Sequence, residues 1–247
     1  MNPSLNIVVL AFQYPFLISQ YEWNGVRVYS FGGKNKGKLQ RLLLWRRVRQ
    51  KLKTIITENN VAGILNFWLG ECALVSKYIS KKYSIRSFTW MIGQDARKGN
   101  RFIRYIRPQS GSLIALSDSL CEEFYSNYGI RPAYTIPLGI DTAEFNPTVP
   151  ERRIDVLGAG SLIQLKQYDV FIRIIAALRY TNANIKAVIC GAGPEKERLQ
   201  RMIGNAGLEN NISLAGEIAH AEVLQLMQSS KVFLHPSSYE GFGGVCA

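Results

Sequence analysis

The sequence predicts an α/β fold made of two halves, each a parallel sheet with helices on its faces. Three observations support this prediction. Strand-like apolar runs alternate with helical stretches along all 247 residues, hydrophobic residues make up 47% of the composition, and glycine-rich turns follow three strand-like runs of the second half. Such an alternation is typical of βαβ units, in which a helix connects two parallel strands.

The first half opens with the apolar run LNIVVLAF at residues 5–12. The runs that follow are short and apolar on both faces, which favours strands buried in a parallel sheet. Stretches with three- and four-residue periodicity, the spacing of a helix face, separate them. The predicted strands are 5–12, 26–31, 61–68, 85–93, 112–118 and 133–139, and the predicted helices are 34–53, 70–82 and 118–128.

A boundary is predicted in GIDTAEFNPTVPERR, where a glycine and two prolines interrupt regular structure. The charge balance changes there too, because residues 1–150 carry 20 lysines and arginines against 9 acidic residues, while residues 151–247 carry 10 against 9. We therefore expect a hinge between two domains, with the hinge at 145–152 and the domains at 1–148 and 149–247.

The second half repeats the βαβ pattern. Its predicted strands are 153–160, 185–193, 211–217 and 232–237, and its predicted helices are 167–180, 195–206 and 220–230. Two Rossmann-like domains with a cleft between them would account for both halves. Ligands in such folds bind beyond the carboxyl ends of the strands, where the glycine-rich turns of the second half lie.

The stretch KNKGKLQRLLLWRRVRQKLK at 34–53 holds nine cationic residues and no acidic one, within a chain of net charge +12. Apolar residues recur at the spacing of one helix face: Leu42, Trp45, Val48, Leu52 and Ile55. Two interpretations stay open. Either the apolar stripe packs on a sheet under a solvated basic face, or the helix is attracted to anionic lipid headgroups. Nucleic acid is disfavoured, because the usual signatures of DNA- or RNA-binding modules are missing.

Other features of the sequence limit the cellular setting. The N-terminal apolar run has no basic residues before it and is too short for an export signal, and no stretch approaches the roughly 20 apolar residues of a membrane span. The four cysteines lie far apart without a CxxC pair, so neither a zinc site nor a disulfide framework is indicated. We expect a cytoplasmic protein, either free or peripheral at the inner face of the membrane.

Three turns of the second half carry the candidate chemistry: GAGSLIQLKQ (158–167), GAGPEKE (191–197) and SSYEGFGG (237–244). Glycines there would let backbone N–H groups approach a phosphate, and Lys166 would neutralise a diphosphate as a point charge. Ile163 and Lys196 stand where a GxGxxG motif would end, which argues against a dinucleotide enzyme. Ordinary βα turns remain the alternative for each glycine taken singly.

Taken together, these segments resemble a known family. The stretch 153–247, with GAGSLIQLKQYDVF, AVICGAGPEKERLQ and LHPSSYEGFGGVCA, resembles the nucleotide-sugar-binding half of the GT-B retaining glycosyltransferases of family 4, the glycosyl transferases group 1. Upstream, LIALSDSLCEEFYSNYGIRPAYTIPLGIDTAEFNP matches the segment entering the linker, with Ser117, Gly139, Asp141 and Phe145 at the characteristic places. Residues 1–109 match the family only in the alternation and general placement of their predicted strands and helices.

The resemblance implies transfer of a sugar from a nucleotide diphosphate sugar, UDP- or GDP-linked, to a saccharide or lipid-linked acceptor. It implies retained anomeric configuration, no cofactor and no required metal, and a role in polysaccharide, lipopolysaccharide or glycolipid synthesis. Lys166 should contact the donor diphosphate, and Glu240 should lie near the sugar or the charge developing at its anomeric carbon. The implied donor-binding residues are Gly160, Ser161, Lys166, Gly191, Gly193, Gly241, Phe242 and Gly243. For Glu240 the alternative is an acid at a helix start beside a glycine turn.

The sequence departs from the family in several places. Ser161 stands where an arginine often lies beside the diphosphate, and Ile92 where many relatives have a histidine. Gln94 or Asp95 would supply polar groups to the acceptor-side cleft instead, although a loop carboxylate with satisfied hydrogen bonds is the alternative for Asp95. His235 is expected to be a packed residue at a strand end.

The family's second glutamate would fall at position 248, one residue after Ala247. We therefore expect the second domain to be incomplete and the sequence to be a fragment or a truncated product. Two functional alternatives to the transferase follow: a non-catalytic remnant that still binds nucleotide sugar, and a nucleotide-sugar epimerase of the same fold.

Overall fold

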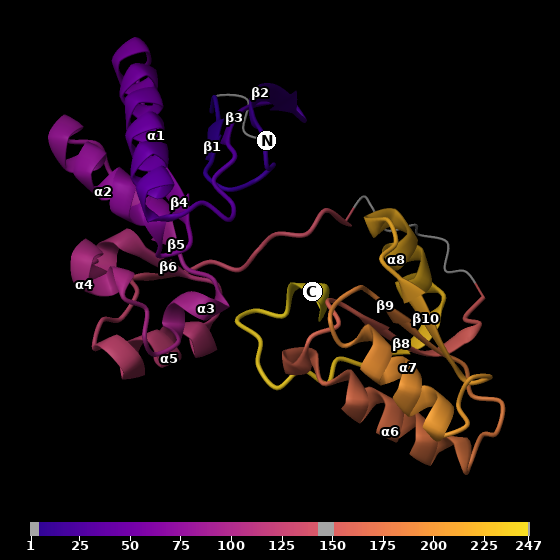
Figure 1. Cartoon of the computed structure of the whole chain (residues 1–247). Helices are drawn as coiled ribbons and strands as arrows, with labels where there is room; N and C mark the ends of the chain where they lie inside the picture. Colours follow the sequence, from indigo (N-terminus) through magenta and orange to yellow (C-terminus); the bar gives the residue numbers. More distant parts are fainter. Residues whose placement is uncertain (1–4, 143–150, 247) are drawn as a thin grey trace. The chain divides into compact units, whose positions relative to one another are not determined.

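The computed structural model describes residues 5–142 and 151–246, and the chain divides into two compact units (Figure 1). Unit 1 spans Met1–Pro137 and unit 2 spans Leu138–Ala247. The predicted boundary between residues 148 and 149 lies outside the described residues. Each unit is an α/β structure, as the strand and helix pattern predicts.

Unit 2 holds a four-stranded, all-parallel sheet with the strand order β10-β9-β8-β11. A helix precedes each strand after the first, as in successive βαβ units. The strands are β8 (Ile154–Ala159), β9 (Ala187–Cys190), β10 (Ile212–Gly216) and β11 (Ser230–Phe233), and the helices are α6 (Tyr168–Arg179), α7 (Lys196–Asn205) and α8 (His220–Gln228).

The helices of unit 2 cover both faces of its sheet (Figure 1). On one face, α6 and α7 bury the larger core, where Phe171, Ile175 and Ile189 are at most 1% exposed. On the other face, α8 packs against Leu157 and its neighbours. The sheet is therefore packed against apolar side chains on both faces.

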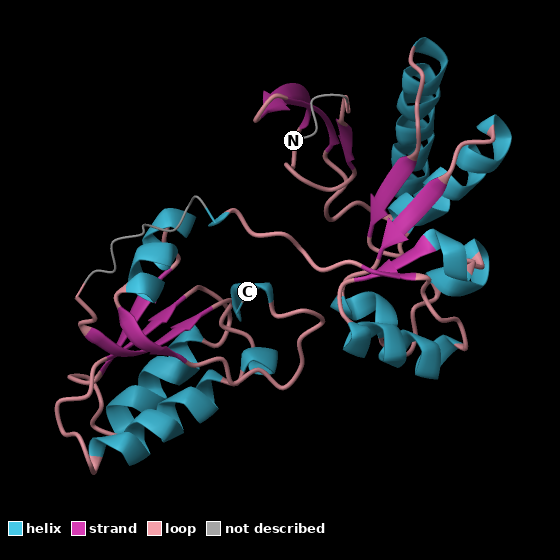
Figure 2. Ribbon diagram, turned by 180° about the vertical axis from the view of Figure 1, so that it is seen from behind, coloured by secondary structure: helices cyan, strands magenta, loops and turns pink. Residues whose placement is uncertain are grey.

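Unit 1 contains two sheets rather than one. A parallel sheet has the strand order β4-β5-β6-β7, and a separate three-stranded sheet has the order β1-β3-β2. The strands are β1 (Val8–Ala11), β2 (Ile18–Trp23), β3 (Val26–Phe31), β4 (Ile64–Phe67), β5 (Ser87–Trp90), β6 (Leu113–Ala115) and β7 (Tyr134–Thr135). The helices are α1 (Lys38–Glu58), α2 (Glu71–Tyr83), α3 (Gly93–Ala96), α4 (Phe102–Ile106) and α5 (Asp118–Tyr128). Figure 2 shows the two sheets as separate groups of strands.

The hairpin formed by β2 and β3 was not among the predicted elements. β2 pairs antiparallel with β3 around Asn24 and Gly25, which both adopt positive φ, 48° and 76°. An Asn-Gly pair between two short strands is the strongest local hairpin signal, because such turns need positive φ at both central residues. The turn signal is the Asn-Gly pair in WNG. The strand before it, ISQYEW, has no continuous apolar run, and all six of its residues are exposed.

The prediction for the buried face of α1 was wrong in part. The buried residues are Leu44, Val48 and Leu52, while Leu42 is 58% exposed. Leu44 and Val48 pack with Val75 of α2 in a small core to which β1 and β3 also contribute. Because α1 packs against both α2 and the small sheet, the helix face that is buried contains Leu44, Val48 and Leu52 and not Leu42.

The turns after β8 and β9 lie against each other in unit 2. Gly160 N donates to Cys190 O at 2.9 Å, and Leu162 N donates to Ala192 O at 2.9 Å. A Cβ on Gly191 would stand 1.9 Å from the Gly160 carbonyl oxygen, and Gly191 has φ +145°. Only glycine fits there, because both the contact and the backbone conformation exclude a side chain.

We predict that Gly191→Ala lowers the free energy of unfolding of unit 2 by about 2 kcal/mol or more, from backbone strain and overpacking. Gly204→Ala, inside α7 with only a Glu209 carboxylate oxygen 3.5 Å away, is the control and should be neutral or stabilising. Amide hydrogen exchange in β8 and β9 measures both effects in unit 2 separately from unit 1. Equal protection in the two variants would contradict the packing argument.

Candidate functional site

The order of the strands in unit 2 predicts a ligand site at the carboxyl ends of two neighbouring strands. From β8 the chain proceeds through β9 to β10 on one side, and then returns to place β11 on the other side of β8. The carboxyl ends of β8 and β11 are therefore neighbours at the point where the strand order reverses. Open α/β sheets bind their ligands outside the strand ends at such a switch point.

The segments that follow β8 and β11 are joined directly. Ser238 N donates to Leu165 O at 3.0 Å, and Ser238 Oγ donates to the same oxygen at 3.2 Å. Leu165 belongs to a short 3-10 turn, Gln164–Lys166. The hydrogen bonds hold the loop after β11 against the turn that carries Lys166.

Glu240 is the centre of the charged groups at these strand ends. Its Oε1 atom accepts a hydrogen bond from Lys166 Nζ and lies 2.7 Å from His235 Nε2. The side chains of Lys166, His235 and Glu240 are 18%, 13% and 29% exposed, so the ion pair lies in a partly desolvated environment. Residues 74 positions apart in the sequence therefore form one cluster.

The electrostatic environment keeps Glu240 ionised. Partial burial of the carboxylate alone would raise its pKa, but hydrogen bonds from Lys166 and His235 outweigh that effect and lower the pKa below its ordinary value of 4.5. At neutral pH the cluster therefore pairs a carboxylate with an ammonium group. Such a carboxylate can stabilise positive charge, and the ammonium can stabilise negative charge.

The remaining residues predicted for the donor occupy different places around this cluster. Gly160 lies beside Lys166, since a Cβ there would be 3.8 Å from Lys166 Cε, and Gly243 lies beside Glu240 at the same distance from Glu240 Cβ. Gly241 and Phe242, which lie between Glu240 and Gly243 in the chain, are half-buried, whereas Ser161 is exposed. Gly191 and Gly193 approach the backbone of the neighbouring turn, as ordinary βα turns do. Contact of these residues with a donor stays a prediction.

The residues predicted for the acceptor side lie in unit 1. Gln94 is exposed, and Asp95 is 6% exposed. Asp95 Oδ2 accepts a hydrogen bond from Ile92 N at 3.0 Å, which caps the short helix α3, and burial raises the Asp95 pKa. This geometry matches a loop carboxylate with satisfied hydrogen bonds, while a role for Gln94 in an acceptor cleft stays a prediction.

His235 is the functional candidate that sequence reasoning missed. It was expected to pack at the end of a strand, and its ring does stack on Phe233, with centroids 6.2 Å apart and planes at 14°. Its Nε2 atom also contacts Glu240, which lies five residues later. The available signal was the position of a titratable residue between a strand end and an acid in the same loop.

The described residues offer neither a metal cluster nor a membrane span. In 5–142 and 151–246, no group of three or more His, Cys, Asp or Glu side chains is placed to hold a metal ion. No helix within these ranges has the length and apolar character needed to cross a bilayer.

Comparison with known proteins gives a family match for unit 2. Residues 140–247 match the family model described as glycosyl transferases group 1. The chain is 24% identical over 148 residues to a phosphatidylinositol N-acetylglucosaminyltransferase subunit of Arabidopsis thaliana, and 30% identical over 89 residues to 2-deoxystreptamine N-acetyl-D-glucosaminyltransferase of Niallia circulans. These alignments cover 58% and 36% of this chain but only 33% and 23% of the two relatives, so the chain matches a third or less of their length.

Solved structures match a larger share of the chain. Sucrose-phosphate synthase from Thermosynechococcus elongatus aligns with a TM-score of 0.73 at 13% identity, covering 97% of this chain and 67% of that one. The Anabaena protein HepE, solved with UDP and glucose, aligns with a TM-score of 0.64 at 22% identity, covering 89% and 63%. Together with the family match, this likeness confirms the predicted α/β class and its GT-B type.

We predict that the Glu240 carboxyl titrates below 4.5 and that Lys166→Met moves its midpoint upward, because the variant removes a hydrogen-bond donor to the ionised form. Since the folded pKa is depressed, Glu240 contributes stability above its ordinary pKa of 4.5, and this contribution is lost as the pH falls through the folded value. Carbon-13 NMR of the carboxyl group measures the midpoint. Lys186→Met, at the opposite end of β9, should leave it unchanged, and an unchanged midpoint in Lys166→Met would contradict the assignment.

Proposed function

Residues 140–247 match the glycosyl transferases group 1, and from this premise we propose that the protein transfers a sugar from a nucleotide diphosphate sugar to a saccharide or lipid-linked acceptor with retention of configuration. The reaction serves polysaccharide, lipopolysaccharide or glycolipid synthesis at the cytoplasmic side of the membrane. Transfer needs no metal ion in this proposal, since Lys166 supplies the positive charge for the departing diphosphate.

The observation that carries this proposal is the pairing of Lys166 with Glu240 at the switch point of the sheet. In retaining transfer, negative charge grows on the leaving diphosphate while positive charge grows at the anomeric carbon. A cation and a carboxylate held side by side are arranged to stabilise both charges. Backbone N–H groups of Gly241, Phe242 and Gly243 would hold the donor phosphates and sugar.

The relatives suggest which donor to test first. The two curated relatives described above are named as N-acetylglucosaminyltransferases, and one solved neighbour is a complex with UDP and GlcNAc. UDP-N-acetylglucosamine is therefore the first donor to test, with other UDP- and GDP-sugars after it. The acceptors in the relatives' names differ from each other, so they support only the broad acceptor class.

We predict that the protein binds UDP or GDP and that Lys166→Met weakens binding by about ten- to a hundredfold, the value of a hydrogen bond between charged groups. Glu240→Gln should keep binding close to that of the unchanged protein and lose transfer. Lys186→Met is the control, because it removes the same charge at the far end of the sheet. Calorimetric titration measures binding, and release of UDP or GDP from the sugar nucleotide measures turnover.

The outcomes separate the three candidate functions. A folded protein that neither binds nor turns over any sugar nucleotide would contradict the proposed transferase function. Binding without turnover supports a non-catalytic nucleotide-sugar binder. Conversion of the donor into its epimer without an acceptor supports an epimerase.

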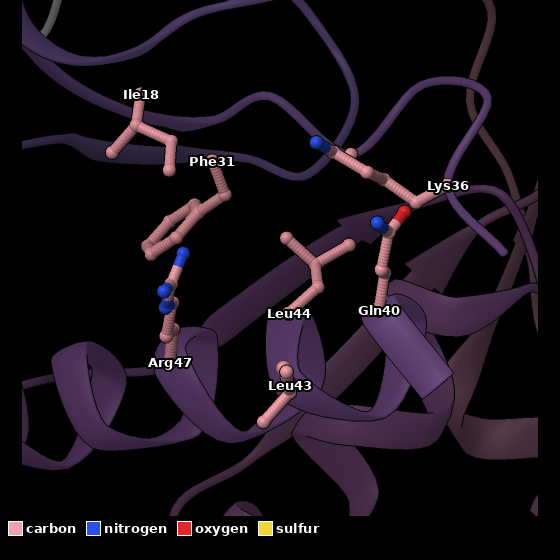
Figure 3. Close-up of a pocket in the computed structure, with 8 residues that line it drawn as sticks. Ile18, Phe31, Lys36, Gln40, Leu43, Leu44 and Arg47 are labelled. Carbon is pink, nitrogen blue, oxygen red and sulfur yellow. The ribbon is translucent and has the colours of Figure 1, made fainter. Parts of the chain in front are cut away.

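Unit 1 carries a surface suited to an anionic membrane, which we propose as the place where a lipid-linked acceptor is approached. A hollow of about 210 Å³ lies between the hairpin and α1, lined by Ile18, Phe31, Gly33, Lys36, Gln40, Leu43, Leu44 and Arg47 (Figure 3). Exposed apolar side chains occur on α1 and at the start of β2 with the two residues before it, each 57–79% exposed: Phe16, Leu17, Ile18, Leu39, Leu42 and Leu43.

The charges around this surface are available for lipid headgroups. Among the described residues, Lys36, Arg46 and Arg47 form no ion pair, whereas Arg41 is bound to Glu71 at 2.7 Å. Exposed leucines beside unpaired cations match a membrane interface, where apolar side chains enter the headgroup layer and cations attract anionic lipid. The alternative, a solvated basic face, accounts for the cations but not for the exposed leucines.

We predict that vesicles containing phosphatidylserine co-sediment the protein and that neutral vesicles do so at least several-fold less. Leu39→Ser with Leu42→Ser should weaken binding at all salt concentrations, because apolar insertion is lost, while Arg46→Gln with Arg47→Gln should weaken it mainly at low salt. Lys81→Gln with Lys82→Gln, which removes the same charge from the end of α2, is the matched control. Binding that is independent of lipid charge and of salt would count against the membrane proposal.

A further inference from the structure

The Lys166–Glu240 pair raises a question that the proposed function does not answer. Lys166 is the group expected to bind the donor diphosphate, yet its ammonium group is already hydrogen-bonded to Glu240. When the ammonium turns toward a diphosphate, its hydrogen bond to Glu240 weakens. A partly buried carboxylate that loses its partner becomes costly, so another donor must hold it.

His235 is placed to be that second donor. Its Nε2 atom lies 2.7 Å from the same Glu240 oxygen that Lys166 binds. An ionised carboxylate can only accept hydrogen bonds, so the proton of this contact must be on Nε2. The ring is 13% exposed and stacks on Phe233 at the end of β11, which fixes its orientation independently of Lys166.

We infer that His235 is a positioning residue that keeps Glu240 in place when Lys166 engages the donor diphosphate. The inference rests on the proposed function, because it assumes a nucleotide diphosphate ligand. His235 has no contact with the ligand in this account and acts through Glu240. Its removal therefore penalises the ligands that recruit Lys166, and leaves those that do not recruit it unaffected.

Comparing the affinity for a nucleoside with the affinity for its diphosphate isolates this effect. Uridine can occupy a nucleoside site without recruiting Lys166, whereas UDP recruits it. In His235→Phe, which keeps an aromatic ring to stack on Phe233, Glu240 Oε1 keeps Lys166 but loses its imidazole donor. Withdrawing the lysine then leaves that oxygen without either of these two donors, so the preference for UDP over uridine should fall.

The test titrates the 247-residue chain with UDP and uridine, and with GDP and guanosine in parallel. We expect His235→Phe to reduce the ratio of diphosphate to nucleoside affinity by about tenfold, the value of a hydrogen bond to a charged group, with nucleoside affinity changed less than about twofold. His235→Gln, whose amide can donate from nearly the same place, should restore most of the ratio. In a Lys166→Met background, His235→Phe should no longer change the ratio.

Other outcomes overturn the inference. Equal weakening of nucleoside and diphosphate, or no rescue by glutamine, would show that His235 has a merely structural role. If the unchanged protein binds neither diphosphate more tightly than its nucleoside, the proposed function itself fails and the inference falls with it.

A second measurement needs no variant of His235 and does not depend on the ligand. The sequence holds only two histidines, His220 and His235, so a His220→Gln variant assigns the nitrogen-15 spectrum of the imidazole rings. We expect the His235 ring to carry a proton on Nε2 at pH 7. A neutral ring protonated only on Nδ1 would overturn the inference.

Discussion

The parallel pairing of β11 with β8 is the constraint on which the candidate site depends. Val232 pairs with Val156 and Phe233 with Leu157, and this register fixes where the loop after β11 begins relative to the turn after β8. A shift of one residue would turn each side chain of β11 to the other face of the sheet. The register thus sets both the packing of α8 beneath β11 and the meeting of Glu240 with Lys166.

The site combines a rigid base with groups that have more than one partner. The rigid base consists of the turns after β8 and β9, whose backbone contacts leave no room for a Cβ at Gly191. The group with two partners is Glu240, of which one oxygen contacts both Lys166 and His235. A cluster of this kind can exchange one partner for a ligand without losing its structure, because the backbone that supports it does not depend on the exchanged bond.

Much of the fold and part of the site follow from local sequence pattern. The alternation of strand and helix patterns in unit 2 predicted its α-helices and its first three strands, whereas the last strand, predicted at 232–237, lies at Ser230–Phe233. The acid-glycine loop singled out Glu240. Properties that depend on tertiary contacts were not accessible in this way. The burial of Leu44 in place of Leu42 reflects the position of α1 between α2 and the small sheet, and the contact of His235 with Glu240 reflects a loop conformation that periodicity does not encode.

The link between Ser238 and Leu165 has a consequence for how this site tolerates sequence drift. Its shorter bond joins a main-chain N–H to a main-chain carbonyl, at 3.0 Å, and so is present whatever side chains occupy the two positions. Replacement of either residue by another non-proline amino acid leaves that bond available. The contact between the loop that carries the acid and the turn that carries the lysine is thus maintained by the backbone, and it does not depend on the side chains of Ser238 and Leu165.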